Sequence, residues 1–180
     1  MSERILISNA RLVDPGSGRD ERGSLAIADG RIVAAAAKAP ADFSPERTID
    51  AEGSVVAPGL VDLCARLGEP GHEHDGLLES ELAAAVAGGV TSLVCPPDTD
   101  PVLDEPGLVE MLKFRARKIS RCRLFPLGAL TRRLEGEALT EMAELTEAGC
   151  VGFSQAEKPM RDNLTLSRAL QYASTRGYAV

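Results

Sequence analysis

The side chains best suited to chemistry in this sequence lie within residues 62–75. Cys64 and Arg66 are two residues apart at the end of an apolar run, so both face the same side of a predicted strand. A thiolate can bind a metal ion, but a guanidinium has no free lone pair and keeps its positive charge. Because a fixed cation repels a dication at short range, we expect no metal site at Cys64 and Arg66.

A second candidate is the H-x-H motif of His72 and His74, which has Glu73 and Asp75 beside it. Imidazole and carboxylate groups are common zinc ligands, so these residues are a possible metal site. The surrounding residues predict a loop, which fixes ligands less firmly than a strand does. We therefore favour a solvated loop over a metal site here.

Arg66 is expected to form an ion pair. Asp62 lies on the same predicted strand, Asp98 follows the next strand, and Asp75 lies on the intervening loop. The carboxyl ends of neighbouring parallel strands lie at one edge of a sheet, where such side chains converge. We predict that Arg66 pairs with one of these three carboxylates.

The four cysteines show no C-x-x-C spacing, and each lies in or beside an apolar run: Cys64, Cys95, Cys122 and Cys150. We expect buried free thiols, which suit a reducing cytoplasm. A nucleophilic Cys64 would need an activating partner such as a histidine. Because the two histidines lie on a predicted loop, we favour a buried thiol over a nucleophile at Cys64.

The composition excludes several classes of partner. The 180 residues carry a net charge of −7, and 44% of them are hydrophobic, which is typical of a globular protein with a core. The acidic balance argues against nucleic acid and against an anionic membrane surface as partners. Because no apolar run reaches about 18 residues and no signal-peptide pattern is present, we expect no membrane span and a cytoplasmic protein.

Residues 1–57 predict a small β module. Short apolar runs alternate with turn residues there, and Asp29-Gly30 separates two of the runs at the spacing of a two-residue hairpin. From residue 58 the pattern changes, because apolar runs now alternate with amphipathic stretches of helix length. We therefore place a boundary between residues 57 and 58.

The region 58–180 predicts successive βα units. We expect strands over 60–64, 92–95, 122–127 and 151–153, helices over 77–87, 105–119, 137–148 and 164–176, and a further strand from 178. Gly88, Gly149 and Gly177 each follow a predicted helix, where glycine commonly adopts the left-handed conformation that ends it. Such units predict a parallel sheet with helical crossovers.

A complete (β/α)8 barrel takes about 250 residues, and residues 58–180 hold four βα units and the start of a fifth strand. We therefore predict an α/β fold, with the β module followed by a partial TIM barrel that represents roughly the first half of a larger protein. Two strand edges would be open in such a half barrel, so we expect it to be marginally stable or to associate. A doubly wound sheet is the alternative, but no glycine-rich phosphate loop follows the first strand of this region.

Several motifs, in the same order along the chain, resemble class I dihydroorotases of the amidohydrolase superfamily. They include P-G-L-V-D at 58–62, G-E-P-G at 68–71, A-G-G-V-T at 87–91 and P-D-T-D-P-V at 97–102. Further similar segments are L-G-A-L-T at 127–131 and A-G-C-V-G-F-S at 148–154. The resemblance implies the metal-dependent hydrolase barrel, preceded by an N-terminal β module.

The positions that carry the family's chemistry differ in this sequence. By the resemblance, two metal-binding histidines fall on Cys64 and Arg66, and a metal-bridging aspartate falls on Gln155. The arginine and the asparagine that hold the substrate carboxylate fall on Gly68 and Asp98. Each change removes a metal ligand or an anion-binding group. The resemblance therefore implies that these positions retain no catalytic, metal-binding or substrate-binding residue, and that the family's zinc is absent.

The implied protein is a catalytically inactive dihydroorotase homologue in pyrimidine biosynthesis. In some bacteria such pseudo-dihydroorotases assemble with aspartate transcarbamoylase, so the implied partner is its catalytic subunit, the implied role is structural and an oligomer is expected. Two alternatives stay open. One is an active amidohydrolase for a cyclic amide, with a site rebuilt from His72, His74 or later ligands. The other is a binding module that holds a metabolite in the vacated pocket.

Overall fold

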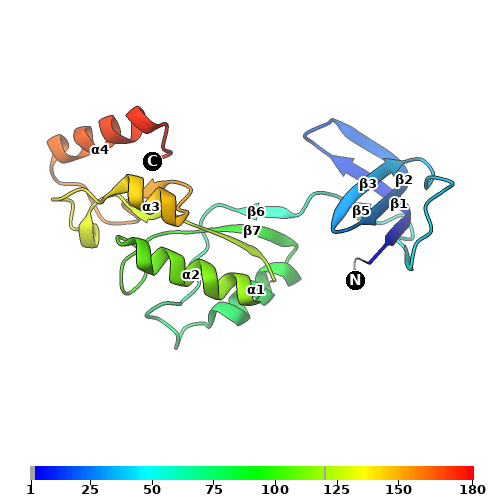
Figure 1. The fold of residues 1–180 in the computed structure, drawn as a ribbon, viewed down its shortest axis with the longest axis horizontal. Helices are drawn as coiled ribbons and strands as arrows, with labels where there is room; N and C mark the ends of the chain where they lie inside the picture. Colours follow the sequence, from blue (N-terminus) through cyan, green and yellow to red (C-terminus); the bar gives the residue numbers. More distant parts are fainter. Residues whose placement is uncertain (1–2, 120) are drawn as a thin grey trace. The chain divides into compact units, whose positions relative to one another are not determined.

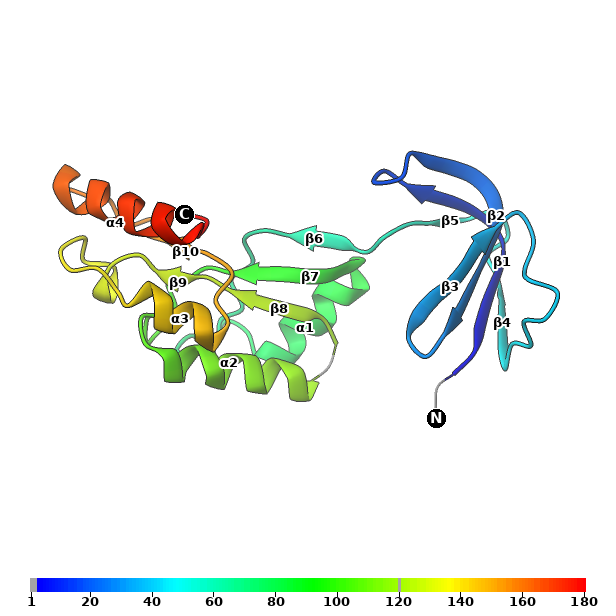
Figure 2. The same ribbon diagram turned by 45° about the horizontal axis from the view of Figure 1, so that its top comes forward.

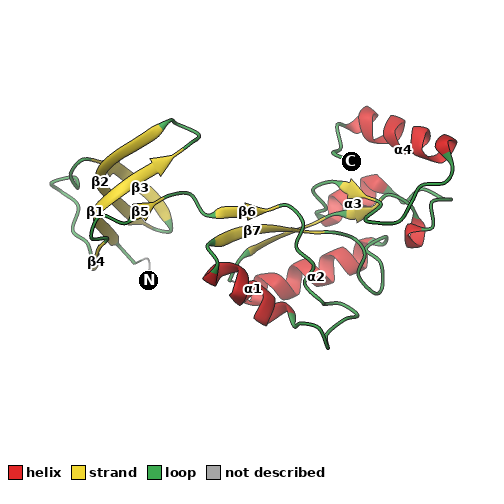
Figure 3. Cartoon of the chain, turned by 180° about the vertical axis from the view of Figure 1, so that it is seen from behind, coloured by secondary structure: helices red, strands yellow, loops and turns green. Residues whose placement is uncertain are grey.

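The computed structural model describes residues 3–119 and 121–180, which divide into two compact units. The first unit ends at Pro58, and the second begins at Gly59. Among the described residues, strands and loops alone build the first unit, whereas the second contains the helices (Figure 3). The chain as a whole therefore has a mixed α/β fold.

The first unit is a five-stranded sheet in the order β3-β2-β1-β4, with β5 also paired to β1 (Figures 1 and 2). Its strands are β1 (Ile5–Asp14), β2 (Arg19–Ala28), β3 (Arg31–Ala36), β4 (Arg47–Asp50) and β5 (Val55–Val56). β2 is antiparallel to β1 and β3, whereas β4 and β5 are parallel to β1. The β2–β3 hairpin turns at Asp29 and Gly30, which both have positive φ, so the predicted two-residue turn is confirmed.

The second unit is built on parallel strands. The strands are β6 (Leu60–Asp62), β7 (Val90–Cys95), β8 (Arg123–Pro126), β9 (Gly128–Ala129) and β10 (Phe153–Ser154). β6, β7 and β8 form one sheet in chain order, and β9 pairs with β10. A helix joins β6 to β7 and another joins β7 to β8, which confirms the predicted βα crossovers.

The helices of this unit are α1 (Leu78–Ala87), α2 (Pro106–Ile119), α3 (Met142–Ala148) and α4 (Asn163–Arg176), with a short 3-10 helix η1 (Arg132–Leu134). α1 and α2 lie on the same side of the β6-β7-β8 sheet (Figure 2). Their fully buried residues Leu82 and Leu112 join Leu93 of β7 and Leu124 of β8 in one core. Among residues 3–119 and 121–180, the helices are all too short or too polar to cross a bilayer.

Local signals explain where the helices begin and end. The Asp162 carboxylate accepts hydrogen bonds from the Leu164 and Thr165 amides, which starts α4. Gly149 and Gly177 end α3 and α4 in the left-handed conformation, as predicted. The prediction was wrong for Gly88, which has φ of −82°, because Gly89 takes the positive φ instead.

Several predicted boundaries were wrong. The strand predicted over 60–64 ends at Asp62, and the strand predicted over 151–153 lies at Phe153–Ser154. The helix predicted over 137–148 begins at Met142, because Leu139 forms a β-bridge with Thr131 that holds the preceding residues extended. The strand predicted from Tyr178 is not formed, although the Ala179 carbonyl accepts a hydrogen bond from the Phe153 amide of β10. Propensity alone did not reveal either contact, because it does not specify which residues pair with one another.

One edge of the parallel sheet is formed by β6, which pairs with β7 alone among the described strands. Leu60 and Val61 of β6 are 59% and 62% exposed, and Leu63, which follows the strand, is 73% exposed. A strand that is this apolar belongs in the interior of a parallel sheet, where both faces are covered. The second unit therefore presents an uncovered apolar edge at β6.

Candidate functional site

Arg66 joins three segments of the second unit. Its Nε lies 2.9 Å from Asp98 Oδ2, and its Nη2 lies 3.1 Å from Glu157 Oε1. Asp98 follows β7 and Glu157 follows β10, so the three side chains meet beyond the carboxyl ends of the strands. The hydrogen bond to Asp98 and the charge of Asp98 raise the pKa of Arg66 above its usual value.

The predicted ion pair of Arg66 is therefore confirmed with Asp98 as the partner. Within the described residues, neither Asp62 nor Asp75 forms an ion pair with Arg66. Glu157 was not foreseen, although its position soon after a predicted strand end is the signal that could have revealed it. The Asp98 side chain is 24% exposed and that of Glu157 is 84% exposed, so Asp98 is the less screened partner.

Cys64 differs from its prediction, because its side chain is exposed and not buried. The Asp62 carboxylate accepts a hydrogen bond from the Cys64 amide at 2.9 Å, which turns the chain immediately after β6. This turn places Cys64 beyond the strand and outside the core. No histidine that could activate the thiol forms a hydrogen bond with it among the described residues, so the geometry gives no nucleophilic role to Cys64.

The other three cysteines are buried, as predicted: Cys95, Cys122 and Cys150. Burial raises the pKa of Cys95 and of Cys150 to about 12, and it also raises the pKa of Cys122. Because the thiolate is the reactive form, these groups are inert at neutral pH. They contribute to the core of the second unit.

Gln155 is fixed by a hydrogen-bond network. Its side-chain carbonyl accepts from the Thr131 hydroxyl at 2.9 Å, and its amide nitrogen donates to the Leu134 carbonyl at 2.9 Å. Thr131 is fully buried, and its hydroxyl oxygen also accepts from the Gly136 amide. Both ends of the Gln155 amide are therefore occupied, and a carboxylate could not donate the bond to Leu134.

Gly68 has no room for a side chain. Its φ is +70°, and a Cβ built there would lie 2.6 Å from the Gly76 carbonyl oxygen. The carbonyl of Gly68 also accepts a hydrogen bond from the His72 amide at 2.6 Å. The loop therefore has a conformation that excludes an arginine at this position.

Glu69 anchors the same loop, although sequence reasoning gave it no role. It is 3% exposed, and its Oε2 accepts a hydrogen bond from the Leu78 amide at the start of α1. Arg115 of α2 pairs with its other carboxylate oxygen. The G-E-P-G motif was the available signal, since a buried carboxylate in such a motif needs partners of this kind.

Arg66 and Asp98 line a pocket of about 220 Å3, together with His72, Asp75 and Glu81. Typical small-molecule sites occupy about 300–1,000 Å3, so this pocket is smaller than most. Three carboxylates and one guanidinium face it, which does not suit an anionic ligand. The pocket thus lacks both the size and the charge of a carboxylate-binding site.

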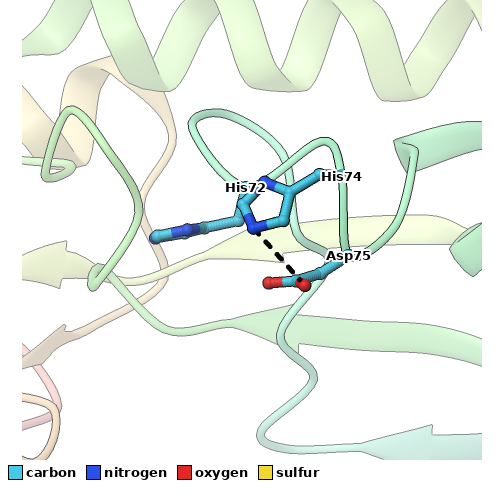
Figure 4. A group of neighbouring side chains, drawn as sticks. All are labelled: His72, His74 and Asp75. Carbon is cyan, nitrogen blue, oxygen red and sulfur yellow. Dashed lines mark ion pairs between the residues drawn. The ribbon is translucent and has the colours of Figure 1, made fainter.

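His72, His74 and Asp75 lie together on the loop that borders this pocket (Figure 4). All three are exposed, and one potential ligand atom from each lies within 4.8 Å of the others. His74 Nε2 is 3.5 Å from Asp75 Oδ1, and the rings of His72 and His74 are edge to face. These residues could hold a divalent metal ion, whereas Cys64, Arg66 and Gln155 do not converge on one.

Comparison with known proteins supports one family. A sequence model described as Dihydro-orotase-like matches residues 53–175. A Dihydroorotase-like protein of Pseudomonas putida is 51% identical over 171 residues, which cover 95% of this chain and 40% of that protein. A protein named Dihydroorotase from Pelobacter propionicus is 43% identical over 171 residues, which cover 94% of this chain and 40% of that protein. The chain thus spans about two fifths of the length of these relatives.

Solved structures show the same fold at lower identity. The L-hydantoinase (dihydropyrimidinase) of Arthrobacter aurescens has a TM-score of 0.80 and 23% identity, covering 98% of this chain and 39% of that one. A D-hydantoinase has a TM-score of 0.71 and 21% identity, covering 99% of this chain and 39% of that one. The chain therefore resembles part of these hydantoinases in fold. With residues 53–175 matched, the chain belongs to the dihydro-orotase-like family.

Proposed function

We propose that this chain is the N-terminal portion of a catalytically inactive dihydroorotase-like protein. The observation that carries the proposal is the ion pair between Arg66 and Asp98, at 2.9 Å. Metal-dependent hydrolysis needs a dication that is held with an open coordination position. A guanidinium that is bound to a carboxylate fills this place with a permanent positive charge, so it repels a dication.

The residues present do not fit the zinc that the family resemblance implies. Cys64 faces solvent beyond β6, and Arg66 has no lone pair to donate. Gln155 uses both ends of its amide in bonds to Thr131 and Leu134. Gly68 has no space for the arginine that would hold a substrate carboxylate. We therefore derive no hydrolytic step through a metal at these positions.

The proposed architecture is the first half of a TIM barrel behind an N-terminal β module. Helices α1 and α2 lie on one side of β6, β7 and β8, which is the arrangement of successive βα units in a barrel. The exposed apolar edge at β6 is consistent with closure by further strands. The relatives are long enough to supply such strands, because this chain covers 40% of the Pseudomonas putida protein.

The proposed role is structural, as an assembly subunit for aspartate transcarbamoylase in pyrimidine biosynthesis. The family resemblance supplies this partner, and the altered site supports a role that does not need hydrolysis. Some relatives are named Dihydroorotase-like protein and not Dihydroorotase. We place the protein in the cytoplasm and expect it to form an oligomer with its partner.

Two measurements on the protein at its natural length test the proposal. The first is hydrolysis of dihydroorotate with zinc supplied, for which we expect no rate above the uncatalysed background. The second is co-expression with the aspartate transcarbamoylase catalytic chain, followed by size-exclusion chromatography with light scattering. We expect one complex that contains both chains. Hydrolysis, or separate elution of the two chains, would contradict the proposal.

The alternative is an active amidohydrolase for a cyclic amide with a rebuilt metal site. It is favoured by the convergence of His72, His74 and Asp75 within 4.8 Å. Several relatives at 36–43% identity are also named Dihydroorotase. This alternative predicts a zinc-dependent hydrolase activity that disappears when His72 and His74 are replaced by alanine.

A further inference from the structure

The loop that carries His72, His74 and Asp75 has a defined backbone. The Asp75 amide donates to the His72 carbonyl at 2.9 Å, which closes a turn over residues 72–75. The His72 amide in turn donates to the Gly68 carbonyl at 2.6 Å. Both ends of the potential ligand set are therefore tied to the same hydrogen-bonded loop.

Contacts on both sides stabilise this loop. Glu69 fixes its start through bonds to α1 and α2, and the Asp100 amide donates to the Pro70 carbonyl. The Glu73 carboxylate accepts a hydrogen bond from the Gly71 amide at 3.1 Å, so it faces back toward the loop. The side chains of His72, His74 and Asp75 are all exposed, and Figure 4 shows the His74 ring facing the Asp75 carboxylate.

The distances suit a small metal ion after a modest adjustment. The ligand atoms lie within 4.8 Å of one another. Zinc binds imidazole nitrogen at about 2.0–2.1 Å, so two ligand atoms on one ion are at most about 4 Å apart. Because all three side chains are exposed, rotation about their side-chain bonds can close a gap of about 1 Å.

The surrounding charges also favour a cation. Residues 72–76 contain Glu73 and Asp75 and no lysine or arginine, and Glu81 lines the neighbouring pocket. Arg66, which lines the same pocket, is paired with Asp98 and Glu157. The local field at the loop is therefore negative, and it attracts a divalent cation.

We propose that His72, His74 and Asp75 form a surface site for one divalent transition-metal ion. Two imidazoles and one carboxylate suit zinc and its neighbours such as cobalt, nickel and copper, with water completing the coordination. The site is separate from the positions of Cys64, Arg66 and Gln155 and uses none of them. It binds metal without any hydrolytic step, so it goes beyond the proposed function and does not depend on it.

Isothermal titration of the metal-free protein with zinc chloride tests this site. The variants are H72A, H74A and D75N, whose side chains are exposed, so they are expected to fold. C64S controls for the exposed thiol, and E79Q is a matched carboxylate control on the neighbouring helix. Circular dichroism verifies that each variant keeps the wild-type secondary structure.

We expect one zinc ion per chain, with H72A and H74A each weakening binding by about tenfold or more. D75N should weaken it by a smaller factor, and C64S and E79Q should stay within about twofold of wild type. Absence of zinc binding, or unchanged binding in H72A and H74A, would overturn the proposal. If zinc binding is lost in C64S and kept in both histidine variants, the metal binds at Cys64, where the family resemblance places a metal-binding histidine. That result would contradict the proposed function.

Discussion

Arg66 and Asp98 form a hydrogen-bonded ion pair, with Nε 2.9 Å from Oδ2, between the segments that follow β6 and β7. In the family resemblance these positions carry a metal-binding histidine and a substrate-binding asparagine. Under the proposed function, the ion pair of Arg66 and Asp98 stands in place of both groups. We therefore expect each of the two residues to stabilise the other.

This coupling predicts non-additive losses of stability. R66A and D98A should each lower the free energy of unfolding, and the double variant should lose less than the sum. We expect a coupling of about 0.5–1 kcal/mol, because Arg66 is half-exposed and the pair is partly screened by solvent. Urea denaturation of the four proteins measures it. R161A is the control, since the structure gives Arg161 no ion pair among the described residues, and a coupling of zero would contradict the account.

Gly68 provides a second prediction. G68A should destabilise the protein more than G177A, although both glycines have nearly the same φ, +70° and +68°. Gly177 has open space around its Cβ position, so its variant reports the backbone strain alone, about 1–2 kcal/mol. Gly68 adds a clash with the Gly76 carbonyl, and we expect at least about 1 kcal/mol more. Equal losses would show that the loop relaxes easily and could accept the family's arginine.

Gln155 provides a third prediction. Q155E keeps the size of the side chain but removes the donor to the Leu134 carbonyl, so a buried acceptor loses its partner. We expect a loss of about 1–3 kcal/mol at neutral pH by chemical denaturation. Q171E is the matched control, because Gln171 is exposed on α4, and it should be neutral.

The stability of the Q155E variant should also depend on pH. A carboxyl group facing the Leu134 carbonyl is better accommodated when protonated, so its folded pKa lies above the unfolded value of about 4.3. The loss of stability of Q155E relative to the wild type should therefore be smallest below about pH 4. It should grow as the pH rises through the folded pKa of the introduced carboxyl group. A loss of stability that is independent of pH would contradict the hydrogen bond between the Gln155 amide and the Leu134 carbonyl.

The cysteines give a fourth prediction. In the folded 180-residue chain, one thiol should react rapidly with a chromogenic disulfide reagent at neutral pH, and C64S should abolish that reaction. The other three are buried, and the pKa values of Cys95 and Cys150 are about 12, so they should react only on unfolding. Two or more fast thiols in the native chain, or none, would contradict the exposure assigned to Cys64.

The sequence allowed much of the second unit to be predicted, because its signals are local. Amphipathic periodicity located α1, α2 and α4 to within a residue at each end, and glycine marked the ends of α3 and α4. The pairing of Arg66 with a carboxylate also followed from parallel strand ends that share one edge of a sheet.

The features that escaped prediction depend on specific contacts between individual residues. Helix α3 starts late because Thr131 pairs with Leu139, and Cys64 is exposed because Asp62 turns the chain after β6. The ion pair of Glu157 with Arg66 spans 91 residues along the chain. None of these contacts has a signature in hydrophobic periodicity, which reports only which face of an element is buried.

The central claim is that the family's metal site has been lost, and zinc stoichiometry tests it most directly. The protein at its natural length should carry the double substitution H72A/H74A, which removes the surface site without touching Arg66 or Asp98. After exposure to zinc and removal of excess, we predict less than about a tenth of an equivalent of bound metal and no hydrolysis of dihydroorotate. About one or two tightly held ions per chain, together with hydrolysis, would contradict the account.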